Sequence, residues 1–292
     1  MAALLHAGWN LLVKQAADKQ VFTGLALLAG ALLAAPVLVL GFPFPARLWP
    51  YALASAFCEA LYFAALATAY RLADFSLAYP IARGTAPLLL ALWAVWWLGE
   101  RPRPGGVIGL SVLVFGLLVV GAAGRPHPRP LSHLPPTPPP GEGRQAANEG
   151  RRWAGIAAAL AVAVVISVYS VIDGAAVRFV APAPYTALVL ALAAPLIMPV
   201  VLFRSNLQIL RTTWSLHWPR ILLVGALMQI SYGLVLFAYS RSPVSYAGAI
   251  REVSIIFAAL AGWRWLHEPL GRQRLAGAVL ICVGILLIAV AG

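Results

Sequence analysis

Two long segments of this chain repeat one another: residues 83–118 align without a gap to residues 251–286. Each segment begins with an arginine inside an apolar run, Arg83 in the first and Arg251 in the second, and each ends with regularly spaced glycines. A repeated hydrophobic unit with matching charges is typical of secondary transporters, whose binding sites form where the two halves meet. The repeat therefore predicts a duplicated membrane unit.

The composition predicts that lipid surrounds most of the chain. Hydrophobic residues make up 62% and charged residues 10%, with a mean hydropathy of +0.86, so a soluble domain would expose too much apolar surface. Crossing a bilayer takes about 20 apolar residues. Runs near that length occupy residues 21–41, 49–70, 76–98, 105–123, 153–173, 185–203, 221–239, 245–266 and 275–292. Residues 1–13 are read as a further spanning helix, shortened at its start, which gives an all-α polytopic protein with ten transmembrane helices.

Ten helices divide into two repeats of five, and an odd number per repeat forces the second to insert upside down relative to the first. We expect a first repeat over residues 1–124 with helices 1–5, and a second over residues 151–292 with helices 6–10. Residues 125–150 between them are dense in proline, which neither fills a helix nor packs a core. We interpret them as a flexible linker, an insertion without a part in transport, and a docking segment for a PxxP-binding partner is the alternative.

Several classes of function are not indicated. The net charge of +12 comes from basic residues scattered singly between apolar runs, without the clustered stripe of a nucleic-acid-binding protein. Cys58 and Cys282 lie in separate apolar runs, and the histidines form no set of ligands, so we expect no metal and no cofactor. The chain has no HExxH, no GxSxG and no phosphate-binding Gly-Lys motif, so we expect no enzyme and no catalytic residues.

Charged side chains at membrane depth cost about 2.5 to 3.5 kcal/mol each and need a reason to be there. The candidates are Glu59, Arg83, Asp173, Arg251 and Glu252. We interpret Arg83 as a fixed cation facing a central cavity, where it attracts an anionic group of a substrate or pairs with Glu59. The alternative is an arginine that reaches back to the membrane interface. Glu59 is the candidate for proton coupling, because a carboxyl in a low-dielectric site can exchange a proton as access alternates.

Polar and aromatic side chains recur on corresponding helices of the two halves. Glu59 and Tyr62 are three residues apart on one helix face, and Gln229 and Tyr232 have the same spacing in the second half. These four residues are predicted to line the cavity.

The first and sixth helices carry similar groups at similar depth: Trp9 and Asn10, with His6, on the first, and Tyr169, with Ser170 and Asp173, on the sixth. They could line the same cavity. For Asp173 the alternative is a helix terminus at the membrane interface.

Glycines recur on the fifth and tenth helices. Gly109 and Gly116 are seven residues apart, as are Gly277 and Gly284, so each pair lies roughly on one helix face. Such faces allow close contact between helices, within one protomer or between protomers. Glu100 and Glu268 follow Trp-rich helices, and we interpret both as interfacial residues that help to close a tight turn.

Three stretches resemble a known family: HAGWNLLVK at 6–14, AYPIARGTAPLLLALWAVWWLGER at 78–101 and AIREVSIIFAALAGWRWLHEPL at 249–270. They are similar to EamA-type members of the drug/metabolite transporter superfamily. The resemblance implies ten helices in two inverted repeats around a central cavity, with the fourth and ninth helices in its walls. It also implies cytoplasmic termini, whereas the loop arginines and lysines favour the opposite orientation.

The sequence thus leads to one main hypothesis, a secondary active or facilitated transporter that exports small polar or amphiphilic metabolites by alternating access. The alternative is a flippase for a lipid-linked carrier. We expect a monomer or homodimer in a bacterial cytoplasmic (inner) membrane, with the bilayer and a small-molecule substrate as partners and no nucleic acid. The residues expected to form the substrate site are Trp9, Asn10, Glu59, Tyr62, Arg83, Tyr169, Gln229, Tyr232 and Arg251.

Overall fold

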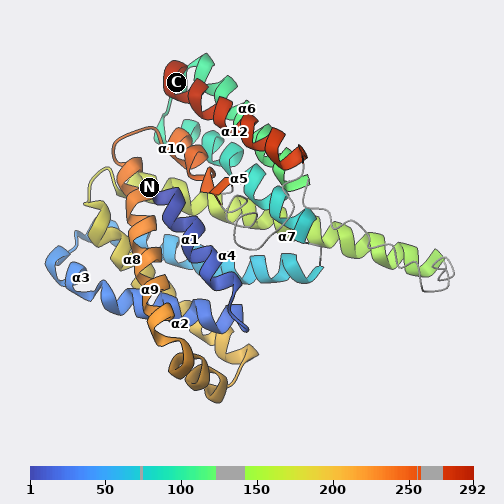
Figure 1. Cartoon of the computed structure of the whole chain (residues 1–292). Coiled ribbons are helices and arrows are strands. Elements are labelled where there is room, and N and C mark those ends of the chain that lie inside the picture. The colour runs from blue at the N-terminus through green and yellow to red at the C-terminus, as the bar shows by residue number, and fades with distance from the viewer. Residues whose placement is uncertain (73–74, 123–141, 255, 258–271) are drawn as a thin grey trace.

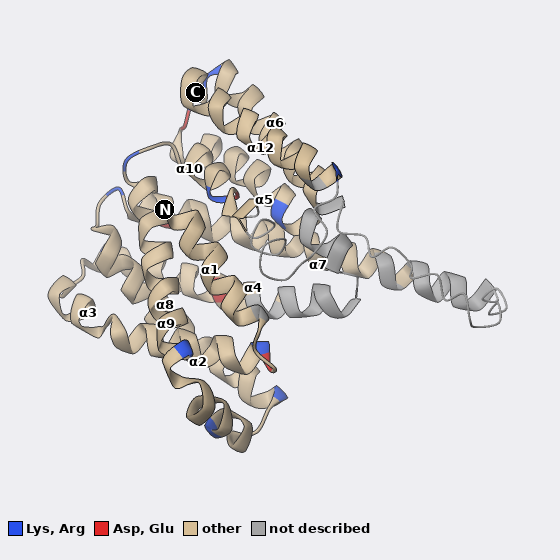
Figure 2. Cartoon of the chain, viewed as in Figure 1, with Lys and Arg blue, Asp and Glu red and all other residues tan. Residues whose placement is uncertain are grey.

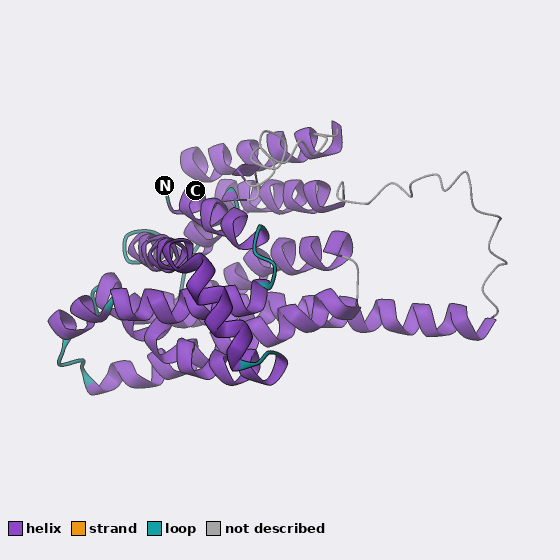
Figure 3. Cartoon of the chain, turned by 60° about the horizontal axis from the view of Figure 1, so that its bottom comes forward, coloured by secondary structure: helices purple, strands orange, loops and turns teal. Residues whose placement is uncertain are grey.

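The computed structural model describes residues 1–72, 75–122, 142–254, 256–257 and 272–292, and within them every regular element is a helix (Figures 1 and 3). The helices before residue 123 are α1 (Ala2–Lys14), α2 (Lys19–Leu33), α3 (Ala35–Gly41), the 3₁₀ turn η1 (Ala46–Leu48), α4 (Trp49–Leu72), α5 (Phe75–Leu98) and α6 (Pro104–Ala122). Those after it are α7 (Glu142–Ala176), α8 (Pro182–Arg204), α9 (Leu207–Tyr239), α10 (Val244–Arg251) and α12 (Arg272–Ala291).

The all-helical membrane class predicted from composition is confirmed. Four described helices are long and apolar enough to cross a bilayer, or five if the bent pair α2 and α3 forms one span. Shorter apolar helices overlap the expected spans at 1–13, 105–123 and 275–292. Helix α10 covers the start of the span at 245–266, of which residues 255 and 258–266 lie outside the described residues. The count of ten spans and their inverted arrangement remain predictions.

Charged side chains are sparse on these helices. Figure 2 shows that most of the lysines, arginines, aspartates and glutamates of the described residues lie in loops and at helix ends. The long apolar stretches between them suit a hydrocarbon environment, where every backbone group must be satisfied within the helix. The few charges at mid-helix positions therefore stand out as candidates for function.

The expected span at 21–41 is broken in the middle. Helix α2 ends at Leu33 and α3 begins at Ala35, and their axes differ by 45°. Pro36 stands in the first turn of α3, where its missing N–H removes no helical hydrogen bond. Because a proline cannot continue α2 without losing a helical hydrogen bond, the chain bends where α2 ends and α3 begins.

Two helices begin earlier than the hydrophobic pattern indicates. Helix α7 begins at Glu142, so the end of the expected linker is helical, and residues 125–141 lie outside the described part. The last proline of the linker is Pro140, and the Glu, Arg, Gln and Ala that follow it favour a helix. Helix α9 begins at Leu207, because the Asn206 side chain accepts a hydrogen bond from the Ile209 N–H at 2.8 Å and caps the helix.

The two halves pack mainly against each other. The most extensive helix contacts pair α6 with α12, α4 with α7, α5 with α7, and α2 with α9, and each pair joins a helix before residue 123 to one after it. Figure 1 shows α6 and α12 side by side near the C-terminus. The inner faces of both halves therefore belong to one shared interior, where the polar side chains meet.

The glycine faces of α6 and α12 meet each other within the chain. A Cβ on Gly109 would lie 2.8 Å from the carbonyl oxygen of Gly284, and a Cβ on Gly116 would lie 2.8 Å from that of Gly277. Side-chain-free positions are needed here because the two backbones touch. Close helix contact at these glycines was predicted from their spacing, and the structure places it within one protomer.

Candidate functional site

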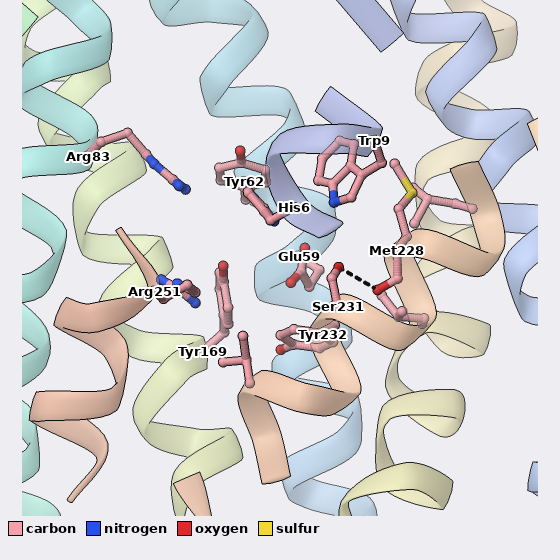
Figure 4. A pocket seen from close by; sticks show the side chains of 13 residues that line it. His6, Trp9, Glu59, Tyr62, Arg83, Tyr169, Met228, Ser231, Tyr232 and Arg251 are labelled. Carbon is pink, nitrogen blue, oxygen red and sulfur yellow. Dashed lines mark hydrogen bonds between the residues drawn. The ribbon is translucent and has the colours of Figure 1, made fainter. Parts of the chain in front are cut away.

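A pocket lies between the two halves, lined from α1, α2, α4, α5, α7, α8, α9 and α10. The volume of the pocket that is accessible to water is about 90 Å³, which is room for several water molecules. Seven of the nine residues expected to form the substrate site line it (Figure 4): Trp9, Glu59, Tyr62, Arg83, Tyr169, Tyr232 and Arg251. The structure thus brings together polar side chains from helices far apart in the sequence.

One end of the pocket is cationic. The Arg83 guanidinium of α5 lies 2.9 Å from one carboxylate oxygen of Glu252, and the Arg251 Nε lies 3.4 Å from the other. The side chains of both arginines are about nine-tenths buried, and that of Glu252 is fully buried. The aligned arginines of the two repeats therefore converge on one carboxylate.

The end of α10 places Arg251 and Glu252 at this point. The helix stops at Arg251, and the turn tightens, with the Glu252 N–H donating to the Ala249 carbonyl at 3.0 Å and the Val253 N–H to that of Ile250 at 3.1 Å. Such 3₁₀-type bonds satisfy the last carbonyls of a helix. A helix that ends inside a transporter interior is a common setting for a substrate site.

Aromatic rings form much of the remaining wall. His6 and Trp9 of α1 meet edge to face with their ring centroids 4.8 Å apart, and Tyr169 of α7 and Tyr232 of α9 do so at 6.5 Å. Edge-to-face pairs are a favourable arrangement for aromatic rings. They give the pocket a surface suited to the carbon skeleton of an organic molecule.

The pocket also contains a carboxyl away from the arginines. Figure 4 shows Glu59 of α4 beyond Tyr62 and Tyr169 from Arg83 and Arg251. The pocket therefore has a basic end, an aromatic middle and an acidic side chain opposite the basic end.

Asp173 lies in a buried hydrogen-bond network next to the pocket. Its side chain is inaccessible to solvent, and its two oxygens accept hydrogen bonds from the hydroxyls of Tyr185, at 2.7 Å, and Tyr232. These bonds connect α7, α8 and α9. Tyr232 is also a lining residue, so the network holds one wall of the pocket in place.

Two of the nine residues expected to form the substrate site do not line this pocket. Asn10 is exposed, and its side-chain amide donates to the His6 carbonyl at 2.7 Å, one helical turn away. Gln229 is half-buried on α9. It is three residues before Tyr232, but the face of α9 that lines the pocket runs through Met228, Ser231, Tyr232 and Val235.

Most of the lining residues that the prediction omitted are apolar. They are Leu27, Leu190, Met228 and Val235, together with Ser231. His6, which the sequence grouped with Trp9 on the first helix, also lines the pocket. Residues 228, 231, 232 and 235 have the spacing of one helix face. The lining residues of α9 could therefore have been predicted from Tyr232 and the helical period. Leu27 and Leu190 carry no such signal, because apolar residues fill α2 and α8.

Glu100 fixes the start of α10 from the other half of the chain. Its carboxylate accepts hydrogen bonds from the Val244 N–H at 2.5 Å, the Ser245 N–H at 3.2 Å and the Ser245 hydroxyl at 2.6 Å. A carboxylate stabilises the positive end of a helix. Glu100 thus contacts the helix that carries Arg251 instead of only closing its own turn. Glu268, for which the same role was predicted, lies outside the described residues.

Comparison with known proteins agrees with this architecture. The model of the EamA-like transporter family matches residues 1–122 and 153–290. The chain belongs to this family, which is part of the drug/metabolite transporter superfamily. It is therefore an integral membrane protein of a transporter family.

A solved structure titled "Crystal structure of protein" is similar in fold. Its sequence is 20% identical, the match covers 98% of this chain and 93% of that one, and the TM-score is 0.73. At this identity the likeness shows the fold alone. No curated protein matches the chain.

Proposed function

We propose that this chain is a secondary transporter that exports a small polar or amphiphilic metabolite by alternating access. The observation that supports it best is the pocket between the two halves, with Arg83, Arg251 and Glu59 in its wall. Charges inside a membrane protein mark pathways for substrates and ions. Membership of a transporter family supports the same function.

In this proposal the basic end and the aromatic middle of the pocket bind two different parts of the substrate. The arginines attract an anionic group, because guanidinium pairs with carboxylate or phosphate by charge-assisted hydrogen bonds. Trp9, Tyr169 and Tyr232 contact the carbon skeleton. Glu59 exchanges a proton with the side of the membrane to which the pocket is open, which couples transport to a proton gradient.

The architecture proposed for this activity is two inverted repeats of five helices, joined by residues 125–150, in a bacterial cytoplasmic membrane. Repeats related in this way can rock against each other and open a fixed site to either side in turn. The contacts of α4 and α5 with α7 are those across which such a movement would occur.

The test is untargeted metabolite profiling of medium and cytosol. Cells would produce the wild-type chain, an Arg83→Ala/Arg251→Ala double variant, or no transporter. We expect one class of compound to accumulate in the medium with the wild type and to fall to the background level with the double variant, because the anionic group loses both of its cationic partners.

An Arg204→Ala/Arg241→Ala double variant is the matched control, because both arginines are exposed and neither lines the pocket. It should export as the wild type does when both proteins reach the membrane at equal levels. Identical profiles for wild-type cells and cells without the transporter would contradict the proposed export.

A further inference from the structure

The turn between α5 and α6 is bonded to the second half of the chain at the start of α10. The Glu100 carboxylate accepts from the Val244 N–H, the Ser245 N–H and the Ser245 hydroxyl, at 2.5, 3.2 and 2.6 Å. The Arg103 N–H of the same turn donates to the Tyr246 hydroxyl at 3.1 Å. Each of these bonds joins one half to the other.

Two further contacts join the halves at the same end of the molecule. The Arg178 guanidinium, in the turn between α7 and α8, donates to the carbonyl of Leu98, the last residue of α5, at 3.2 Å. The Arg47 guanidinium, before α4, lies over the ring of Phe179 with 4.3 Å to the ring centroid. Polar contacts between the halves therefore gather around the turn that holds Glu100.

A layer of buried apolar side chains lies between these contacts and the pocket. On α4, Ala52 precedes the lining residue Glu59 by seven residues, and on α10, Val244 precedes the lining residue Arg251 by the same interval, about 10 Å. Ala52 and Val244 belong to one buried cluster, together with Leu48, Leu90, Val171, Tyr185, Leu236 and Tyr239. Both halves contribute to this cluster, which closes the pocket at the Glu100 end.

The pocket can open at this end only when the two halves move apart here. The apolar layer would separate, and the Glu100 oxygens would exchange their three partners on α10 for water. A contact made in one of two states shifts the equilibrium toward that state. The bonds of Glu100 therefore favour the state that is closed at this end.

We propose that Glu100, with Val244 and Ser245 at the start of α10, is the closing contact of the pocket on this side of the membrane. The contact is present while the pocket is closed at this end and is broken when the pocket opens there. The inference rests on the proposed function, because alternating access is the movement that breaks the contact. Removing the Glu100 carboxylate raises the population of the state that is open at this end.

The test measures how fast a thiol in the pocket reacts from each side of the membrane. Ser231 lines the pocket, so Ser231→Cys is the reporter, in a chain with Cys58→Ala and Cys282→Ala. A membrane-impermeant maleimide would be added to vesicles of either orientation. A separate Ser242→Cys chain, labelled at an exposed position between α9 and α10, identifies the vesicles in which the Glu100 end faces the reagent.

Glu100→Ala should raise the labelling rate of Ser231→Cys from the Glu100 end by about tenfold, because three hydrogen bonds that hold this end closed are lost. The rate from the opposite side should not rise. Glu100→Gln keeps one acceptor oxygen and should show a smaller change in the same direction. It also covers the case in which Glu100→Ala does not fold.

Asp18→Ala is the matched control. The Asp18 carboxylate also caps a helix, because it accepts from the Gln20 and Val21 N–H groups at 3.0 Å each, but it does so within the first half. Both labelling rates should stay at their wild-type values. A difference between the Glu100 and Asp18 variants would thus report the contact between the halves and not the loss of a helix cap.

The inference is overturned if the Glu100 variants leave both rates unchanged, or if they raise the rates equally from the two sides, as a general loss of packing would. Wild-type labelling from both sides with no effect of Glu100→Ala would keep alternating access and remove the role of Glu100. Labelling from the Glu100 end in Glu100→Ala alone would support the closing contact and contradict alternating access in the wild type.

Discussion

A Glu252→Ala variant is expected to lose about 3–5 kcal/mol of its free energy of unfolding, the cost of breaking a buried ion pair by removing one partner. Alanine would remove the carboxylate that both Arg83 and Arg251 contact, although the side chains of both arginines are about nine-tenths buried. Unfolding of the purified protein in mixed micelles with increasing mole fractions of SDS would measure the loss.

Replacing all three charged residues provides the comparison. An Arg83→Met, Arg251→Met, Glu252→Leu triple variant removes the charges together, and such apolar replacements of buried ion clusters are often neutral in stability or better. We expect it to be closer to the wild type than Glu252→Ala is. A Glu252→Ala protein within about 1 kcal/mol of the wild type would show that the carboxylate does not hold the arginines together.

A Gly116→Leu variant should lose about 1–3 kcal/mol or more, the range seen when a side chain is forced into a filled interior. A Cβ at this position would lie 2.8 Å from both the Gly277 carbonyl oxygen and the Ile281 backbone nitrogen. Backbone atoms cannot turn aside as a flexible side chain can, so α6 and α12 would have to separate. The same SDS titration would measure the effect.

Phe115→Leu is the matched control, because Phe115 is the next residue on α6 and its side chain is 59% exposed. Its free energy of unfolding should stay within about 0.5 kcal/mol of the wild type. Equal losses for the two variants would mean that the seam between α6 and α12 does not depend on the glycines.

The fold class could be predicted because its causes are local in the sequence. Long apolar runs predict membrane helices wherever they occur, and the spacing of Gly109 and Gly116 marks a face that needs a close neighbour. What the spacing could not provide was the partner of that face. Gly277 and Gly284 contact this face only because the chain that joins α6 to α12 brings α12 back against α6.

The site could be predicted in part for the same reason. Arg83, Glu59 and Tyr232 stand out because polar groups are costly in lipid, and all three line the pocket. The sharing of Glu252 by two arginines was missed, because a contact between α5 and the end of α10 depends on tertiary packing. The exposed position of Asn10 was missed because the rotation of α1 about its axis cannot be read from one short apolar helix.

Accessibility of Ser231 from the two sides of the membrane tests the central claim, that the pocket between the halves opens to each side in turn. Ser231 lines the pocket, and a Ser231→Cys change adds little volume. It would be made in a chain in which Cys58 and Cys282, the two cysteines, are replaced by alanine. Ser167, which is buried and hydrogen-bonded to Trp93 outside the pocket, supplies the control Ser167→Cys.

A membrane-impermeant maleimide would be added to right-side-out or to inside-out vesicles. We predict that Ser231→Cys is labelled in both preparations and that Ser167→Cys is labelled in neither. If Ser231→Cys reacts from one side only, or no faster than Ser167→Cys, the pocket does not alternate between the two sides and the proposed mechanism is wrong.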